Sequence, residues 1–220
     1  MKNVFAVASV LAIAAGASAS FSEMEMQTQS WAFPLSPGND TVTFNKFDTM
    51  GGTRVLKGVL LEIDGSMQAS ITAENNSVIP VNNFAVSLTG IVDINVGPLS
   101  GGLGIIANSP IVAVSATDNG GIPNGMGLDF HNFGTVSGND SDSAFGFPLP
   151  IWIGPGTIMG AVSGSGGFAA QGTSDATINF DNFGASGTAK LTYFFDAVPT
   201  PGSAALLGLA GLVSIRRRRF

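Results

Sequence analysis

The sequence predicts an all-β protein, an antiparallel β-sandwich of which a jelly roll is one arrangement. Glycine makes up 30 of the 220 residues, and only 11% of the residues are charged. Short apolar runs alternate with Thr, Asn and Ser residues between turn-forming residues, a pattern typical of strands and hairpins. We expect roughly eight to ten short strands with turns at spacings of about 8 to 12 residues, and helix only near the two ends.

Residues 1–19 have the three parts of a secretory signal peptide. Lys2 precedes an apolar core over residues 4–15, and the small residues Ala17 and Ala19 mark the cleavage site. We therefore expect a signal helix that signal peptidase removes. Residues 20–197 then form the exported β-sandwich domain, which is long enough for one hydrophobic core.

The first part of this domain shows a clear hairpin pattern. Residues 59–73 alternate apolar and polar side chains on both sides of Asp64-Gly65-Ser66, which we predict to form a three-residue turn. With that loop length Ile63 faces Met67, so one face of the hairpin is uniformly apolar. The strands before it are expected at residues 21–33 and 41–48.

The second part alternates long apolar faces with glycine-rich segments. One continuous apolar face runs over residues 84–96, with a bend or bulge expected at Gly90. Residues 118–155 are rich in Gly, Pro, Asn and Asp and are expected to be loops. FHNFG at 130–134 is echoed by FDNFG at 180–184, which we interpret as a similar strand end used twice. The last strands are expected at residues 176–180 and 188–195.

Residues 198–220 combine a proline turn, an apolar run and a basic end. As a helix, the run over residues 202–215 would rise about 21 Å against about 30 Å of hydrocarbon. We therefore expect a short transmembrane helix that inserts transiently. The basic cluster favours a cytoplasmic position and consists of Arg216, Arg217, Arg218 and Arg219.

This three-part order resembles the PEP-CTERM sorting signal of bacterial envelope proteins. Pro199, Thr200 and Pro201 occupy the motif, and Thr200 stands where the family usually has Glu. The resemblance implies a Gram-negative-type bacterium and processing by an exosortase, a membrane cysteine protease. It also implies a link to exopolysaccharide production or biofilm.

The domain itself resembles the choice-of-anchor E family of exported bacterial proteins. The similar segments are FNKFDTMGGTRVLKGVLLEIDG at 44–65, AEN at 73–75 and GTAKLTYFFDAVPTP at 187–201. The resemblance implies a β-rich body joined to an interchangeable sorting tail. It implies no activity and no catalytic residues.

The charge of the domain excludes nucleic acids as partners. Without the two terminal signals, 15 acidic residues stand against four basic ones, which gives a net charge of −11 and repels phosphates. The chain has no cysteine, so disulfides and thiolate catalysis are also excluded.

We predict no enzymatic activity. A Ser-His-Asp triad needs a histidine, and the single one, His131, lies among aromatic residues where a structural role is expected. The familiar hydrolase, metalloprotease and nucleotide-binding motifs are missing from the sequence. Surface charge is the expected role of the four glutamates, which are Glu23, Glu25, Glu62 and Glu74.

Two binding candidates remain, and no other cofactor is predicted. Oxygen-rich loops offer Asp118, Asp140 and Asp142 as calcium ligands, although Asx-turns also explain these segments. Three aromatic residues on a proline-stiffened segment would suit stacking on a sugar ring or closure of the sandwich end; they are Phe145, Phe147 and Trp152.

The leading hypothesis is a non-catalytic exported protein of the cell envelope, cell surface or extracellular matrix. Its expected partners are signal peptidase, an exosortase-like membrane protease and extracellular polysaccharide. The alternative hypothesis is a carbohydrate-binding or calcium-dependent adhesive module.

Overall fold

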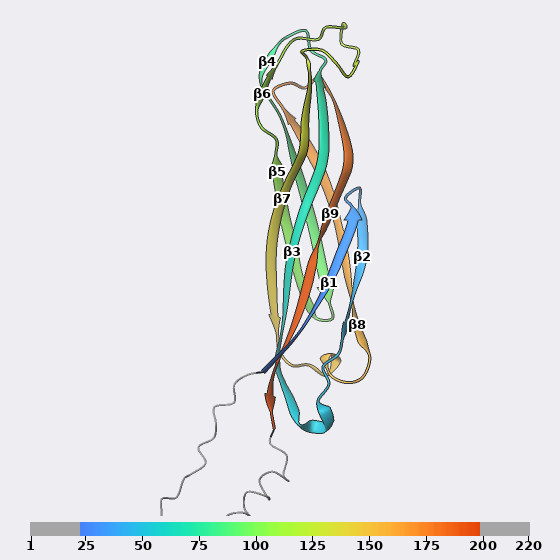
Figure 1. Cartoon of the computed structure of the whole chain (residues 1–220), viewed down its shortest axis with the longest axis vertical. Helices are drawn as coiled ribbons and strands as arrows, with labels where there is room; N and C mark the ends of the chain where they lie inside the picture. Colours follow the sequence, from blue (N-terminus) through green and yellow to red (C-terminus); the bar gives the residue numbers. More distant parts are fainter. Residues whose placement is uncertain (1–22, 199–220) are drawn as a thin grey trace, which may run out of the picture.

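The computed structural model describes residues 23–198 and confirms an all-β antiparallel fold (Figure 1). Besides the strands, the described chain has two single-turn 3-10 helices, η1 (Met50–Gly52) and η2 (Pro150–Trp152). The strands are β1 (Glu23–Pro34), β2 (Gly38–Asn45), β3 (Arg54–Asn75), β4 (Val81–Val96), β5 (Leu99–Asn108), β6 (Val112–Val114), β7 (Phe130–Gly146), β8 (Thr157–Gln171) and β9 (Ala176–Ala197).

The two predicted terminal helices fall outside the described residues. The signal peptide at 1–19 lies wholly outside them, and of the sorting segment 198–220 only Val198 is described. Within residues 23–198, no helix has the length and apolar character needed to cross a membrane.

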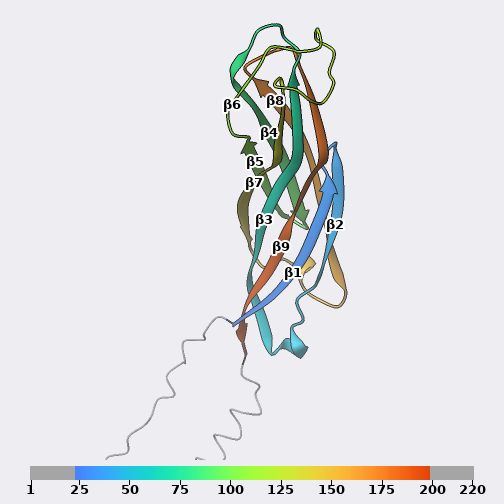
Figure 2. The same ribbon diagram turned by 45° about the horizontal axis from the view of Figure 1, so that its top comes forward.

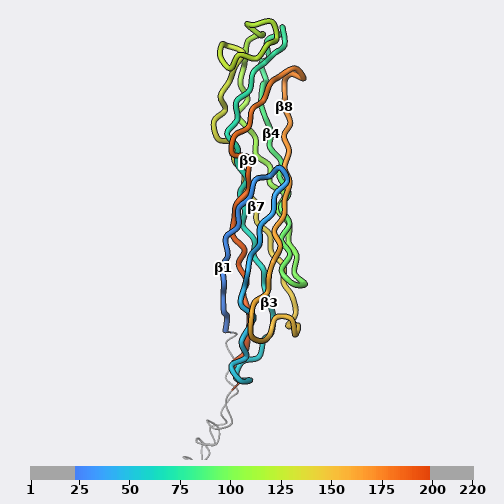
Figure 3. The backbone as a smooth tube through the Cα atoms, turned by 90° about the vertical axis from the view of Figure 1, so that its right-hand side faces the viewer, coloured from blue at the N-terminus to red at the C-terminus, as the bar shows by residue number. Residues whose placement is uncertain are grey.

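The strands form two sheets that pack face to face in a sandwich-like arrangement. One sheet has the order β1-β9-β3-β7, and the other has the order β2-β8-β4-β5 with β6 paired to β4. All strand pairs are antiparallel. From the side, β1 and β9 lie on one side of the elongated body and β8 on the other (Figure 3).

The first and last strands are neighbours, which places both ends of the described chain together. Glu23 pairs with Phe195, so β1 begins where β9 finishes, at the lower end in Figures 1 and 2. We name this the terminal end. The loop 115–129 and the β3–β4 turn at 76–80 lie at the opposite end (Figure 2), which we name the distal end.

One hydrophobic core fills the space between the sheets. Strand β3 contributes its odd-numbered residues and β4 its even-numbered ones, as expected where every second side chain points inward. The buried residues of β3 include Leu61, Ile63, Met67 and Ile71, and those of β4 include Phe84, Leu88, Val92 and Ile94.

The predicted hairpin turn at 64–66 is wrong, because β3 runs without interruption from Arg54 to Asn75. Gly65 is a packing residue: a Cβ added there would lie 3.0 Å from the Trp31 indole. Across the ladder, Gly65 pairs with Gly187 of β9. Two glycines thus make room for one large aromatic side chain.

The predicted bend at Gly90 is also wrong. Strand β4 keeps an unshifted register on both sides of this residue, against β5 and against β8. A Cβ on Gly90 would lie 2.7 Å from Sδ of Met67, which belongs to the facing sheet. Gly90 therefore lets the two sheets approach each other.

Two other expectations also need correction. The segment 118–155 contains the 17-residue strand β7. Because β7 lies at a sheet edge and buries only Val136 fully, its apolar signal is weak. The expected strands 176–180 and 188–195 are parts of the single strand β9.

The repeated FxNFG segments form irregularities on both sides of β3. The register with β7 shifts between Ile71 and Thr72, and the register with β9 shifts between Gln68 and Ser70. The first copy opens β7, as expected for a strand end, but the second lies inside β9. The two copies of the repeated segment therefore form two bulges, one on each side of β3, and bulges increase the local twist of a sheet.

Tyr193, the only tyrosine of the chain, should make stability depend on alkaline pH. Its buried hydroxyl donates a hydrogen bond to the Asn45 carbonyl (2.9 Å). Burial, and secondly the charge of Glu25, raise the pKa of Tyr193 from 10.0 to about 12. Below pH 10 both folded and unfolded states hold the proton. Between pH 10 and 12 the unfolded state loses it first, so the free energy of unfolding should fall by roughly 2 to 3 kcal/mol.

Chemical unfolding across this pH range, together with the absorbance of tyrosinate, measures the effect. In the variant Tyr193→Phe, the free energy of unfolding should no longer show this decrease between pH 10 and 12. A tyrosinate signal that appears near pH 10 while the protein is still folded would contradict the burial of this hydroxyl.

Candidate functional site

The predicted sorting residues cannot be placed. Ala17 and Ala19 precede the described residues, and the motif and basic cluster follow them, namely Pro199, Thr200, Pro201, Arg216, Arg217, Arg218 and Arg219. The structure bears on the remaining candidates, which lie on β7, on η2 and in the distal loop.

The three aromatic candidates do not form one surface. Trp152 is fully buried and packs edge-on against Tyr193, with ring centroids 6.4 Å apart. Phe145 is 61% exposed and lies over Gly58, near Phe194, and Phe147 is 78% exposed. Trp152 therefore closes the core, while only the two phenylalanines are open to a ligand.

Asp140 and Asp142 connect the open edges of the two sheets. Oδ2 of Asp140 accepts a hydrogen bond from Gly104 N, and Oδ2 of Asp142 accepts one from Gly102 N, each at 2.9 Å. Their Oδ1 atoms accept from the next backbone N–H on β7. The two carboxylates thus satisfy donors of the edge strand β5, which would otherwise be open to pairing with another chain.

Asp118 does not share a site with those two carboxylates. It belongs to the distal loop, whereas Asp140 pairs with Gly65, nine residues along β3 from Glu74. Nine residues of strand span about 30 Å. The predicted calcium candidates therefore occupy two separate regions.

The distal loop is organised by Glu74, for which we expected a role as surface charge. Glu74 is only 4% exposed, and its carboxylate accepts hydrogen bonds from the N–H groups of Asn124 (2.9 Å) and Gly125 (2.8 Å). Glu74 is an even-numbered residue of β3 and so lies on the outer face of that strand, but the distal loop folds over this face. Asn75 is fully buried beside it and donates to the carbonyls of Ile79 and Ser115.

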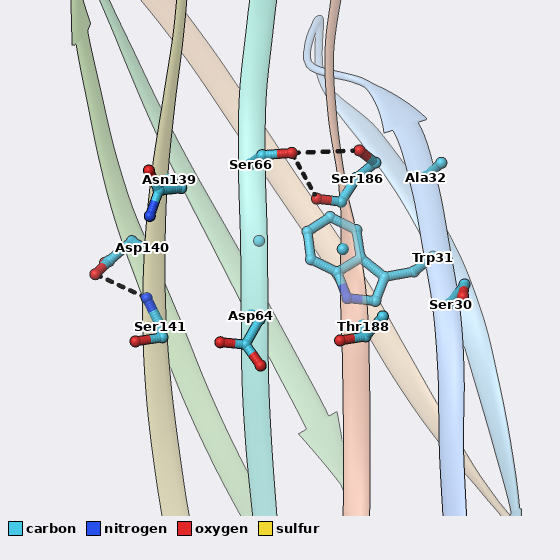
Figure 4. A pocket seen from close by; sticks show the side chains of 12 residues that line it. Ser30, Trp31, Ala32, Asp64, Ser66, Asn139, Asp140, Ser141, Ser186 and Thr188 are labelled. Carbon is cyan, nitrogen blue, oxygen red and sulfur yellow. Dashed lines mark hydrogen bonds between the residues drawn. The ribbon is translucent and has the colours of Figure 1, made fainter.

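A shallow depression of about 640 Å³ lies on the outer face of the β1-β9-β3-β7 sheet (Figure 4). Neighbouring residues in two rows across the sheet supply short polar side chains. One row contains Ser30, Thr188, Asp64 and Ser141, and the next contains Ala32, Ser186, Ser66 and Asn139. The Trp31 side chain reaches from β1 across β9 between these rows (Figure 4).

This depression offers short hydrogen-bonding side chains and is lined by two carboxylates, Asp64 and Asp140. The Ser66 hydroxyl lies 3.4 Å from the Ser186 carbonyl and 3.5 Å from its hydroxyl (Figure 4). His131 is not among the lining residues; it packs edge-on against Phe133, with centroids 4.7 Å apart. The hydroxyl and carboxylate groups of this surface are able to hydrogen-bond to a hydroxyl-rich or hydrated ligand.

Charges are segregated along the molecule. The three ion pairs of the described chain join Arg54 to Glu25, Lys57 to Asp196 and Lys190 to Glu62. No lysine or arginine occurs anywhere in residues 58–189. The distal end therefore carries acidic side chains and no lysine or arginine.

Comparison with protein-family models and with curated proteins finds no match to this chain.

Proposed function

We propose that this chain is a non-catalytic exported protein of the bacterial cell surface or extracellular matrix, with a signal peptide at 1–19 and a PEP-CTERM-type sorting tail at 198–220. The observation that carries the proposal is the pairing of β1 with β9. It brings both ends of the body to the terminal end. A tail that continues from Val198 would hold the body there and leave the distal loops farthest from the attachment point.

The body's strand order supports a jelly-roll form of the sandwich. Without the short β6, eight strands form two four-stranded sheets, β1-β9-β3-β7 and β2-β8-β4-β5. In this order every pair of neighbouring strands except β4 and β5 is distant in sequence, so long-range pairing and packing hold the body together. The Asp140 and Asp142 bonds between the two sheets add to this self-contained body, which suits a protein that works outside the cell without disulfides.

The position of the body in cells tests this function. The host for this test is a Gram-negative bacterium that has an exosortase-like protease. A second protease, added to intact cells or to the culture medium, should digest the β body. Replacing Arg216 to Arg219 by Ser should release unprocessed chain that still carries its tail, because the basic end no longer retains the tail on the cytoplasmic side of the membrane. Lys46→Ser, which removes a basic residue of the body, serves as the control and should behave like the wild type. Equal recovery of all three chains from the cytoplasm would refute the proposal.

A further inference from the structure

Asp129, the residue before β7, is a buried carboxylate at the distal end. Its side chain is fully inaccessible to solvent. Oδ2 accepts a hydrogen bond from Asp118 N at 3.1 Å, whereas Oδ1 accepts none from any donor in residues 23–198. A charged oxygen removed from water is unfavourable unless a partner compensates it.

The unpartnered oxygen faces a second carboxylate. A Cβ built on Gly127 would collide with Oδ1 of Asp129 and Oδ2 of Asp118, because both oxygens lie within 2.7 Å of its position. Gly127 has a φ of +100°, a conformation that glycine adopts readily. The loop therefore directs two carboxylate oxygens toward one point and places no side chain between them.

No basic side chain of residues 23–198 forms an ion pair with these two acids. The ion pairs of the described chain all lie elsewhere, and residues 58–189 contain no lysine or arginine. Glu74 adds a third negative charge to the same loop, but the N–H groups of Asn124 and Gly125 occupy its two oxygens. A bound cation would balance the remaining charge.

We propose that Asp118 and Asp129 bind one calcium ion in the distal loop. Calcium accepts six to eight oxygen ligands in irregular geometry, at about 2.3 to 2.6 Å. No three acidic or histidine side chains of residues 23–198 gather closely enough to hold a metal ion alone, so loop carbonyls and water complete the coordination. With only two carboxylates, we expect a Kd of about 10⁻⁴ to 10⁻³ M, the range of extracellular calcium modules.

The ion would join Asp118, near the start of the loop, to Asp129, the residue that precedes β7. Between these two ligands the loop carries three exposed apolar side chains, Ile122, Met126 and Leu128. Calcium would therefore fix the position of an apolar surface at the distal end. The site depends on folded geometry alone and stands whether or not the chain is exported.

Thermal unfolding of the full chain in calcium chloride and in EDTA tests the site. A ligand that binds only the folded state raises Tm by mass action. At about 10 mM calcium we expect an increase of roughly 3 to 10 °C. Titration calorimetry should give one ion per chain.

Two isosteric variants assign the ligands. Asp129→Asn and Asp118→Asn should each abolish the calcium-dependent rise in Tm. Asp118 is exposed, so its variant will fold even if the buried substitution does not. Asp181→Asn, which removes an exposed carboxylate from β9, should keep the full rise. An unchanged Tm of the wild type in calcium, or an equal rise in the Asp118→Asn variant, would overturn the proposal.

Discussion

Replacing Trp152 by Ala is expected to lower the free energy of unfolding by about 3 to 5 kcal/mol, the usual range for a fully buried aromatic residue. For a domain of this size that corresponds to a fall in Tm of roughly 6 to 20 °C. Trp152 is completely buried and packs against Tyr193, and its indole N–H donates no hydrogen bond within the described chain. The Trp152 side chain therefore stabilises the fold by packing. Replacing it by Ala leaves a cavity at the terminal end of the core.

Phe147→Ala is the matched control, because this residue came from the same group of aromatic candidates and is 78% exposed. Its removal should change the free energy of unfolding by no more than about 0.5 kcal/mol. Urea unfolding monitored by circular dichroism measures both variants. If Trp152→Ala unfolds like the wild type but no longer binds a polysaccharide, the assignment of Trp152 to the core is wrong.

The second large effect is expected at Gly187. A Cβ added there would collide with the Asp64 carbonyl and the Trp31 indole, and would lie 2.8 Å from the Cα of Gly65. Because two of these neighbours are backbone atoms, they cannot move aside without separating β3 from β9. We expect Gly187→Ala to lower the free energy of unfolding by about 2 to 3 kcal/mol, the upper part of the range for overpacking.

Gly104→Ala provides the control for this substitution. Gly104 also lies within a strand, but a Cβ added there meets no atom within 4 Å. That variant should match the wild type or be slightly more stable, because alanine restricts the unfolded chain. Equal stability losses at positions 187 and 104 would indicate a general intolerance of strand glycines and would contradict the close approach of β3 and β9.

The strand faces could be predicted from the sequence because burial in a sheet alternates strictly. The odd positions of β3 and the even positions of β4 both appear as apolar patterns. Because glycine inside a strand pattern is also a turn or bulge signal, the sequence divides β3 at Gly65 and predicts a bend in β4 at Gly90. The alternation keeps the same parity across both glycines, and an unbroken parity favours one continuous strand.

The distal site could be predicted only in part. Asp118 was identified from its oxygen-rich segment, but Asp129 and Glu74 gave no comparable signal. Alternation places Glu74 on an outer face, and only the return of residues 117–129 over that face buries it. Such long-range packing leaves no local pattern in the sequence.

We propose that both ends of the chain are sorting signals attached to an exported β body. The intact mass of the protein recovered from cells that produce it with an exosortase-like protease tests this proposal. We expect a chain that begins at Ser20 and ends before Arg216. A mass equal to that of residues 1–220 in the folded, recovered protein would contradict it.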